Sequence, residues 1–247
     1  MSSPSSPSAP AFELSSVALF GRGFDEYLRM FALDPAALAA RRLLDVAAGP
    51  SSFTAEAHAR GLAAVAVDPM YGPPVAALAS HIDLDYARVL AEQRRKSGLL
   101  RFTYFASIEE AERSRRAAAA RFLADYESGF VQGRYRGGAL PRLPLADRSA
   151  DLVLCAHLLF TYARFFDYAW HRQACLELAR VAAQEVRLHP VSGVDGKPYP
   201  ELGRLRADLA REGIFSRVIP VDYEFFLGTG TTLVLSHQED RLRDLPA

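Results

Sequence analysis

Short apolar runs alternate along the chain with segments of helical periodicity. Four runs have the length and composition of buried strands, at residues 42–46, 64–68, 150–157 and 184–189. Apolar residues at helical spacing follow three of them, at residues 53–60, 168–182 and 199–211. Strands that alternate with helices in this way form parallel sheets covered by helices on both faces. The pattern therefore predicts an α/β fold with a doubly wound, mostly parallel sheet.

The last part of the chain predicts a different strand arrangement. Residues 215–226 and 231–236 both have strand patterns, and the short Gly-rich segment 227–230 joins them. So short a link allows only an antiparallel hairpin. Together with a further strand near Arg134, the expected sheet has about seven strands and ends in this antiparallel pair.

Two segments depart from the alternation. Residues 80–126 are helix-rich, charged and interleaved with aromatic side chains. A crossover needs little more than a dozen residues, so we expect a helical insertion after the second strand, at about residues 80–133, that caps a single domain of residues 12–247. Residues 1–11 are rich in Ser and Pro and predict a disordered tail.

Charge and composition narrow the class of protein. Lys plus Arg and Asp plus Glu are 29 each, and this neutral balance argues against non-specific nucleic-acid binding. The sequence has neither a signal-peptide pattern nor an apolar run long enough for a membrane helix. Its two cysteines make no disulfide framework. We expect a soluble cytoplasmic protein without a membrane or nucleic-acid partner, and the pattern leaves its oligomeric state open.

The turn after the first strand has the chemistry of a nucleoside-binding site. Small residues Ala47, Gly49 and Ser51 follow Asp45, and Asp68 ends the second strand. Ligands of doubly wound sheets bind at the carboxyl ends of the strands, where Asp68 is placed to accept hydrogen bonds from ribose hydroxyls. A carboxylate at Asp45 repels a pyrophosphate and attracts ammonium and sulfonium groups. The turn therefore favours a cationic nucleoside over a dinucleotide.

Four segments in this order resemble motifs of class I S-adenosylmethionine-dependent methyltransferases. They are residues 43–53 (motif I), 65–68 (the strand-two acid), 143–154 (the entry to strand four) and 215–236 (strands six and seven). The resemblance implies the family's fold, methyl transfer and S-adenosylmethionine as cofactor. The cofactor-binding residues that it implies are Asp45, Ala47, Gly49, Ser51, Asp68, Pro69 and Phe160. The chain departs from the family pattern at Ala47 and Ser51, which replace motif glycines, and at Gly138, where an acid often follows strand three.

His157 is the candidate catalytic residue. In the implied site, residues at the end of the fourth strand face the methyl group, and an imidazole with an ordinary pKa near neutrality can act as a base or orient an acceptor. A hydrogen-bonded structural histidine is the alternative. No spacing of His, Cys, Asp or Glu predicts a metal site.

Three functions follow from these patterns. The leading hypothesis is methyl transfer to a small molecule enclosed by the helical cap. The second is a cofactor-binding or regulatory protein of the same fold without transfer activity, which the missing motif glycines favour. The third is a nicotinamide-dependent oxidoreductase, which Asp45 and the terminal hairpin disfavour.

Overall fold

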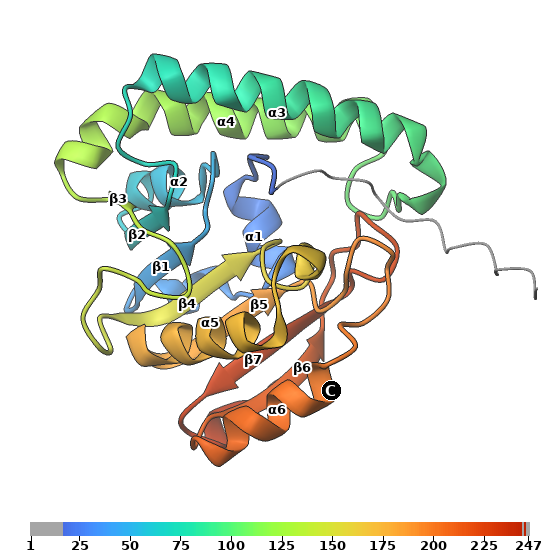
Figure 1. Cartoon of the computed structure of the whole chain (residues 1–247). Coiled ribbons are helices and arrows are strands. Elements are labelled where there is room, and N and C mark those ends of the chain that lie inside the picture. The colour runs from blue at the N-terminus through green and yellow to red at the C-terminus, as the bar shows by residue number, and fades with distance from the viewer. Residues whose placement is uncertain (1–16, 244, 246–247) are drawn as a thin grey trace, which may run out of the picture.

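The computed structural model describes residues 17–243 and 245, and its centre is a seven-stranded sheet in the order β3-β2-β1-β4-β5-β7-β6 (Figure 1). The strands are β1 (Arg42–Val46), β2 (Ala63–Asp68), β3 (Tyr135–Gly137), β4 (Ala150–Ala156), β5 (Ala182–His189), β6 (Phe215–Pro220) and β7 (Thr231–Ser236). The first five strands are parallel, and β7 runs antiparallel to β5 and β6. The predicted doubly wound sheet with its terminal antiparallel pair is confirmed. The predicted tail, residues 1–11, lies outside the described residues.

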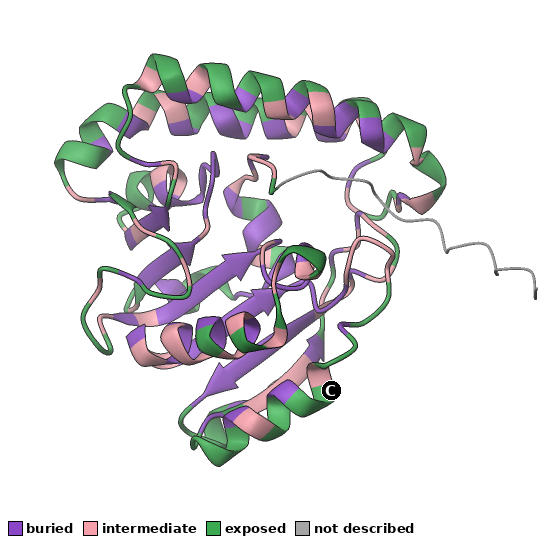
Figure 2. Cartoon of the chain, viewed as in Figure 1, coloured by how far each residue is buried: buried purple, intermediate pink, exposed green. Residues whose placement is uncertain are grey.

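Helices cover both faces of the sheet. They are α1 (Phe24–Met30), α2 (Phe53–Ala59), α3 (Val75–Arg95), α4 (Ile108–Val131), α5 (Tyr168–Val181), α6 (Leu202–Arg211) and α7 (Asp240–Arg243), with 3-10 turns at Pro35–Leu38, Ser97–Leu99 and Ala163–Phe165. Leu44 and Val153 pack on the face of α5 and α6, whereas Leu43 and Leu152 pack on the face of α1 and α2. Strands buried on both faces explain the continuous apolar runs in the sequence (Figure 2). No described helix is long and apolar enough to cross a membrane.

The helical insertion predicted after the second strand is present as α3 and α4, two long helices that lie side by side (Figure 1). It begins at Val75, somewhat earlier than expected. Ser107 caps α4, because its hydroxyl accepts the backbone N–H of Glu110. Tyr86 of α3 and Phe122 of α4 belong to one buried aromatic cluster that joins the pair to the sheet edge.

The final hairpin differs from the prediction in one respect. Strand β6 ends at Pro220 rather than at residue 226, so the four-residue link is wrong and residues 221–230 connect the two strands. In this connection Tyr223 and Phe225 are buried among residues of α1 and α4 instead of continuing the ladder. Apolar alternation does not distinguish a strand from a connection that buries its side chains elsewhere. The correction matters because this connection borders the site.

Candidate functional site

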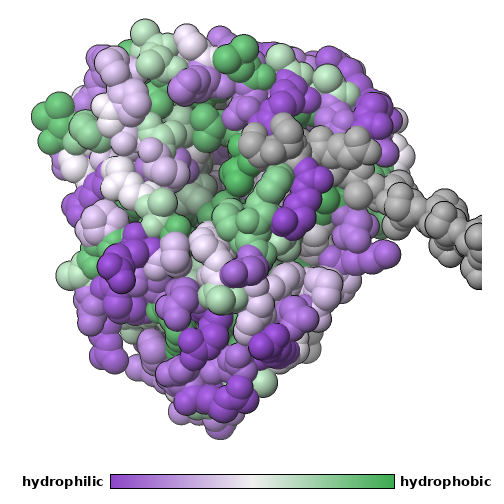
Figure 3. All heavy atoms as spheres, in the orientation of Figure 1, coloured by the Kyte–Doolittle hydropathy of each residue, from purple (hydrophilic) through white to green (hydrophobic). Residues whose placement is uncertain are grey.

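A cleft of about 380 Å³ lies at the carboxyl ends of β1, β2 and β4, where the strand order reverses. Five of the predicted site residues line it: Ala47, Gly49, Asp68, Pro69 and His157. Its other lining residues are largely apolar and include Met70, Ala139, Leu140, Phe166 and Trp170. On the surface, apolar side chains gather between the helical insertion and the elements below it (Figure 3).

Asp68 is fixed at one end of the cleft. Its Oδ2 accepts the backbone N–H of Gly49 at 2.9 Å, and its Oδ1 accepts that of Met70 at 2.9 Å. Ala47 and Gly49 have φ values of 56° and 54°, a left-handed turn that glycine adopts readily and alanine does not. Burial raises the pKa of Asp68 to about 6, although the two backbone hydrogen bonds lower it. The carboxylate is thus held in place and is ionised at neutral pH.

Asp45 lies beside the turn but does not line the cleft. Its Oδ2 accepts a hydrogen bond of 2.9 Å from the hydroxyl of Tyr27 in α1, and its Oδ1 is buried with no partner in the part of the chain that the structure describes. Burial raises its pKa to about 8, more than the Tyr27 hydrogen bond lowers it. Strand alternation directs the side chain of Asp45 toward α1, and its predicted contact with the cofactor stays a prediction.

Ser51 and Phe160, two other predicted cofactor-binding residues, also lie away from the cleft. The hydroxyl of Ser51 donates to the carbonyl of Arg22 at 3.1 Å and accepts the N–H of Phe53 at 3.1 Å, so it ties residue 22 to the start of α2. Phe160 is buried in the core, with its ring centroid 5.2 Å from that of Tyr199. Neither side chain lines the cleft, and their assignment to cofactor binding stays a prediction.

Residues 17–23 pass over the turn like a strap and bring in a site residue that the sequence analysis missed. A Cβ atom on Gly21 would lie 2.6 Å from the carbonyl oxygen of Pro50, so only glycine fits at this crossing. The N–H of Gly21 donates to the hydroxyl of Tyr86 in α3 at 3.1 Å, which fixes the strap to the insertion. The next residue, Arg22, lines the cleft. The only signal for it is the Gly-Arg-Gly sequence before α1.

His157 lies at the opposite end of the cleft from Asp68, directly after β4. Its φ of 52° is unusual for a residue other than glycine, and its backbone N–H donates to the carbonyl of His189 at 2.6 Å. Its Nε2 is buried and has no hydrogen-bond partner among the described residues. Burial, followed by the charge of Arg22, lowers its pKa well below the ordinary value. The imidazole is therefore neutral and a weak base, and its Nε2 can accept a hydrogen bond.

A smaller chamber of about 60 Å³ adjoins the cleft. Arg22, His157 and Tyr162 line both spaces, so these side chains stand where the two meet. The far walls of the chamber come from Val89 and Gln93 of α3 and from Phe226 and Thr229 of the β6–β7 connection. The insertion therefore contributes side chains to the enclosed space.

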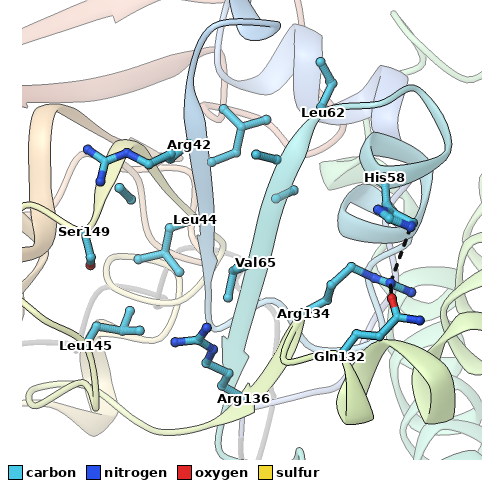
Figure 4. A pocket seen from close by; sticks show the side chains of 14 residues that line it. Arg42, Leu44, His58, Leu62, Val65, Gln132, Arg134, Arg136, Leu145 and Ser149 are labelled. Carbon is cyan, nitrogen blue, oxygen red and sulfur yellow. Dashed lines mark hydrogen bonds between the residues drawn. The ribbon is translucent and has the colours of Figure 1, made fainter.

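A larger pocket of about 510 Å³ lies elsewhere, around the amino ends of β1 and β2 (Figure 4). It is open because the β3–β4 connection, residues 138–149, contains no helix to cover this part of the sheet. Arg42 and Arg134 line it, but each pairs with a carboxylate, of Asp151 and Asp125 respectively. This pocket is at the opposite strand ends from Asp68 and does not belong to the candidate site.

No protein-family model matches the chain. It is similar in sequence to the uncharacterized protein MJ0045 of Methanocaldococcus jannaschii, with 27% identity over 224 residues that cover 90% of this chain and 97% of that protein. Its structure is similar to that of a SAM-dependent methyltransferase of Thermotoga maritima, described as a possible histamine N-methyltransferase, with 13% identity, a TM-score of 0.41 and coverage of 86% and 89% of the two chains. It is also similar to magnesium protoporphyrin IX methyltransferase of Synechocystis PCC 6803 with bound SAM, with 12% identity, a TM-score of 0.44 and coverage of 87% and 91%. Similarities this low carry no ligand or activity from one protein to another.

Proposed function

We propose that the chain is an S-adenosylmethionine-dependent methyltransferase that acts on a small molecule. The observation that carries the proposal is the two-part site, in which the cleft starts at a fixed carboxylate, Asp68, and meets a smaller chamber at His157. Strand β1 lies between β2 and β4, so these two residues stand about 10 Å apart, or two strand spacings. That span suits an adenosyl group that points its sulfonium end toward the chamber.

The residues of the cleft fit this cofactor. Asp68 would accept hydrogen bonds from the ribose hydroxyls through its remaining lone pairs, and Met70 and Leu140 provide apolar surface for the adenine. The turn from Ala47 to Gly49 allows close approach. A pyrophosphate held at the turn would be repelled by the ionised carboxylate of Asp68, which disfavours a dinucleotide.

The chain's own contribution to transfer is positioning, exclusion of water and proton acceptance. When bound, S-adenosylmethionine supplies an electrophilic methyl group on a positively charged sulfur. Val89 and Phe226 line the chamber, and Ala18 and Phe20 of the strap line the cleft. His157 is neutral and its Nε2 has no partner within the described chain, so the imidazole can accept a hydrogen bond from the nucleophile and orient it, and take a proton that methylation has made strongly acidic.

One observation favours the second candidate function, cofactor binding without transfer. The chamber of about 60 Å³ leaves little room for an acceptor beside the cofactor. Incubation of the protein with methyl-labelled S-adenosylmethionine and a pool of small metabolites separates the two functions. The proposal predicts S-adenosylhomocysteine formation that depends on the pool and falls on His157→Asn substitution. Binding without any turnover supports the second candidate.

A further inference from the structure

A buried ion pair lies next to the strap. Arg115 of α4 and Glu26 of α1 are each about 1% exposed, and Nη2 of Arg115 lies 3.1 Å from Oε1 of Glu26. The hydroxyl of Tyr223 donates to Glu26 at 2.7 Å and accepts from Arg115 at 3.0 Å. One guanidinium and one carboxylate compensate each other, so this pair adds no net charge to the interior.

Arg22 has no ion-pair partner in the part of the chain that the structure describes. Its Nη1 donates to the carbonyl of Phe20 at 2.9 Å, and its Nε is buried without a hydrogen-bond partner among the described residues. Burial and then the charge of Arg115 lower the pKa of Arg22 by more than the nearby Glu26 raises it, so Glu26 does not compensate its charge. Among the described residues that line the chamber, Arg22 is the one with a formally charged side chain. A partly buried cation without a counter-ion is costly, so the site is arranged to receive an anion.

His157 and His189, the histidines near Arg22, are uncharged. They neither neutralise the guanidinium nor add positive charge to the site. The hydroxyl of Thr232 donates its hydrogen bond to the carbonyl of Met30 at 2.6 Å, so it can only accept from Nδ1 of His189 at 3.0 Å. Burial, followed by the charge of Arg22, lowers the pKa of His189 to about 3. His189 and His157 are thus both neutral, and Arg22 alone sets the charge at the junction of cleft and chamber.

We propose that Arg22 binds the carboxylate of a small monoanionic acceptor, whose hydroxyl or amine is the methylated group and faces His157. This inference rests on the proposed function. The guanidinium offers N–H groups in the geometry that a carboxylate matches. A volume of about 60 Å³ holds roughly five water-sized groups, which suits a hydroxy or amino acid of very few carbons.

The charges and atoms of the step balance. The lone pair of the acceptor oxygen or nitrogen forms the bond to the methyl carbon as the carbon–sulfur bond breaks, and that bond's electrons return to sulfur. A hydroxyl proton becomes strongly acidic as its oxygen gains the methyl group, and it passes to the imidazole of His157; a methylated amine keeps its proton as an ammonium. The carboxylate itself is not the nucleophile, because its charge is held by Arg22. The sulfonium charge therefore ends as the proton on His157 when the product is a methylated hydroxy acid, or as the ammonium of a methylated amine.

The carboxylate that binds Arg22 could come from either of two molecules. One is the acceptor, and the other is the cofactor, through its amino-acid end. Calorimetry distinguishes the two sources. It compares the affinities of the wild type and of Arg22→Met for S-adenosylhomocysteine and for 5′-methylthioadenosine, which lacks the amino-acid end. Arg29→Met is the matched control, since Arg29 is exposed and pairs with Asp222 outside the site. We expect Arg22→Met to change both affinities by less than about threefold. A tenfold loss for S-adenosylhomocysteine alone assigns the carboxylate to the cofactor and overturns the inference.

The acceptor arm uses glycolate, a two-carbon hydroxy acid, and its neutral counterpart glycolamide as probes. Saturation-transfer NMR is recorded on the free protein and on the protein loaded with S-adenosylhomocysteine. We expect glycolate to bind the wild type and Arg29→Met, and its signal to fall at least tenfold with Arg22→Met or with glycolamide. Equal signals for wild type and Arg22→Met, or no glycolate signal at all, overturn the inference. Failure of both adenosyl ligands to bind the wild type instead contradicts the proposed function, and the glycolate result on the free protein then stands by itself.

Discussion

Asp68 accepts the backbone N–H of Gly49 at 2.9 Å, and this hydrogen bond ties the end of β2 to the turn after β1. The same carboxylate accepts the N–H of Met70. Asp68 therefore has two roles. Its carboxylate holds the turn together, and it is also the polar group that the turn presents to the cleft. Its protonation state should control both the shape of the turn and its affinity for a nucleoside.

The pKa of Asp68, which burial raises to about 6, predicts a pH dependence of cofactor binding. The carboxylate is ionised above this value and protonated below it, so affinity for S-adenosylhomocysteine should fall as the pH drops from 7 to 5. Asp68→Asn should bind roughly tenfold to a hundredfold more weakly at pH 7 and lose most of this dependence. Calorimetry across that range measures both effects. An unchanged pH profile in the variant would show that another group is responsible.

Asp45 predicts an unusual pH dependence of stability. Its pKa is raised to about 8 in the folded chain from 3.8, so the folded state binds more protons than the unfolded state between these values. The wild type should therefore lose stability relative to Asp45→Asn as the pH rises from 5 to 8, by up to about 1.4 kcal/mol per pH unit. The asparagine oxygen can still accept from Tyr27. Urea unfolding of both proteins at several pH values gives the difference, and a constant difference contradicts the raised pKa.

Gly21 predicts a steric effect on the strap. In Gly21→Ala the new methyl group would lie 2.6 Å from the carbonyl oxygen of Pro50, so the strap must lift away from the turn. Ala18 and Phe20 of the strap, which line the cleft, move with it, and we expect cofactor affinity to fall at least several-fold with little change in overall secondary structure. Gly98→Ala is the control, because nothing lies within 4 Å of its Cβ position. Equal affinities for the two variants would show that the strap has no part in binding.

The buried pair of Arg115 and Glu26 predicts a strong effect of removing one partner. Arg115→Met leaves the Glu26 carboxylate buried without its cation, at a cost of about 3 to 5 kcal/mol in the free energy of unfolding. The double variant Glu26→Gln/Arg115→Met should recover much of this loss. Urea unfolding measures both, and a double variant no more stable than the single one would argue against charge compensation as the role of the pair.

The sequence allowed the sheet and one end of the site to be predicted because both follow local patterns. Buried strands appear as apolar runs, and Asp68 was recognisable as the acid that ends one of them. Asp45 was assigned to the cleft because its strand end was known but the direction of its side chain toward α1 was not. Arg22 has no local signature beyond the Gly-Arg-Gly sequence, since only the path of the strap brings it beside residues more than a hundred positions away. The position of Phe160 in the core was not predictable for the same reason, because a loop path follows from tertiary packing and not from spacing.

The central claim is that the cleft between Asp68 and His157 binds an adenosyl cofactor. The most direct test is isothermal titration of the purified protein with S-adenosylmethionine, S-adenosylhomocysteine and NAD in parallel, repeated with Asp68→Ala. The account predicts micromolar binding of the two adenosyl ligands, no binding of NAD, and severe loss of affinity in the folded variant. Absence of binding by both adenosyl ligands, or affinity that Asp68→Ala leaves unchanged, would contradict it.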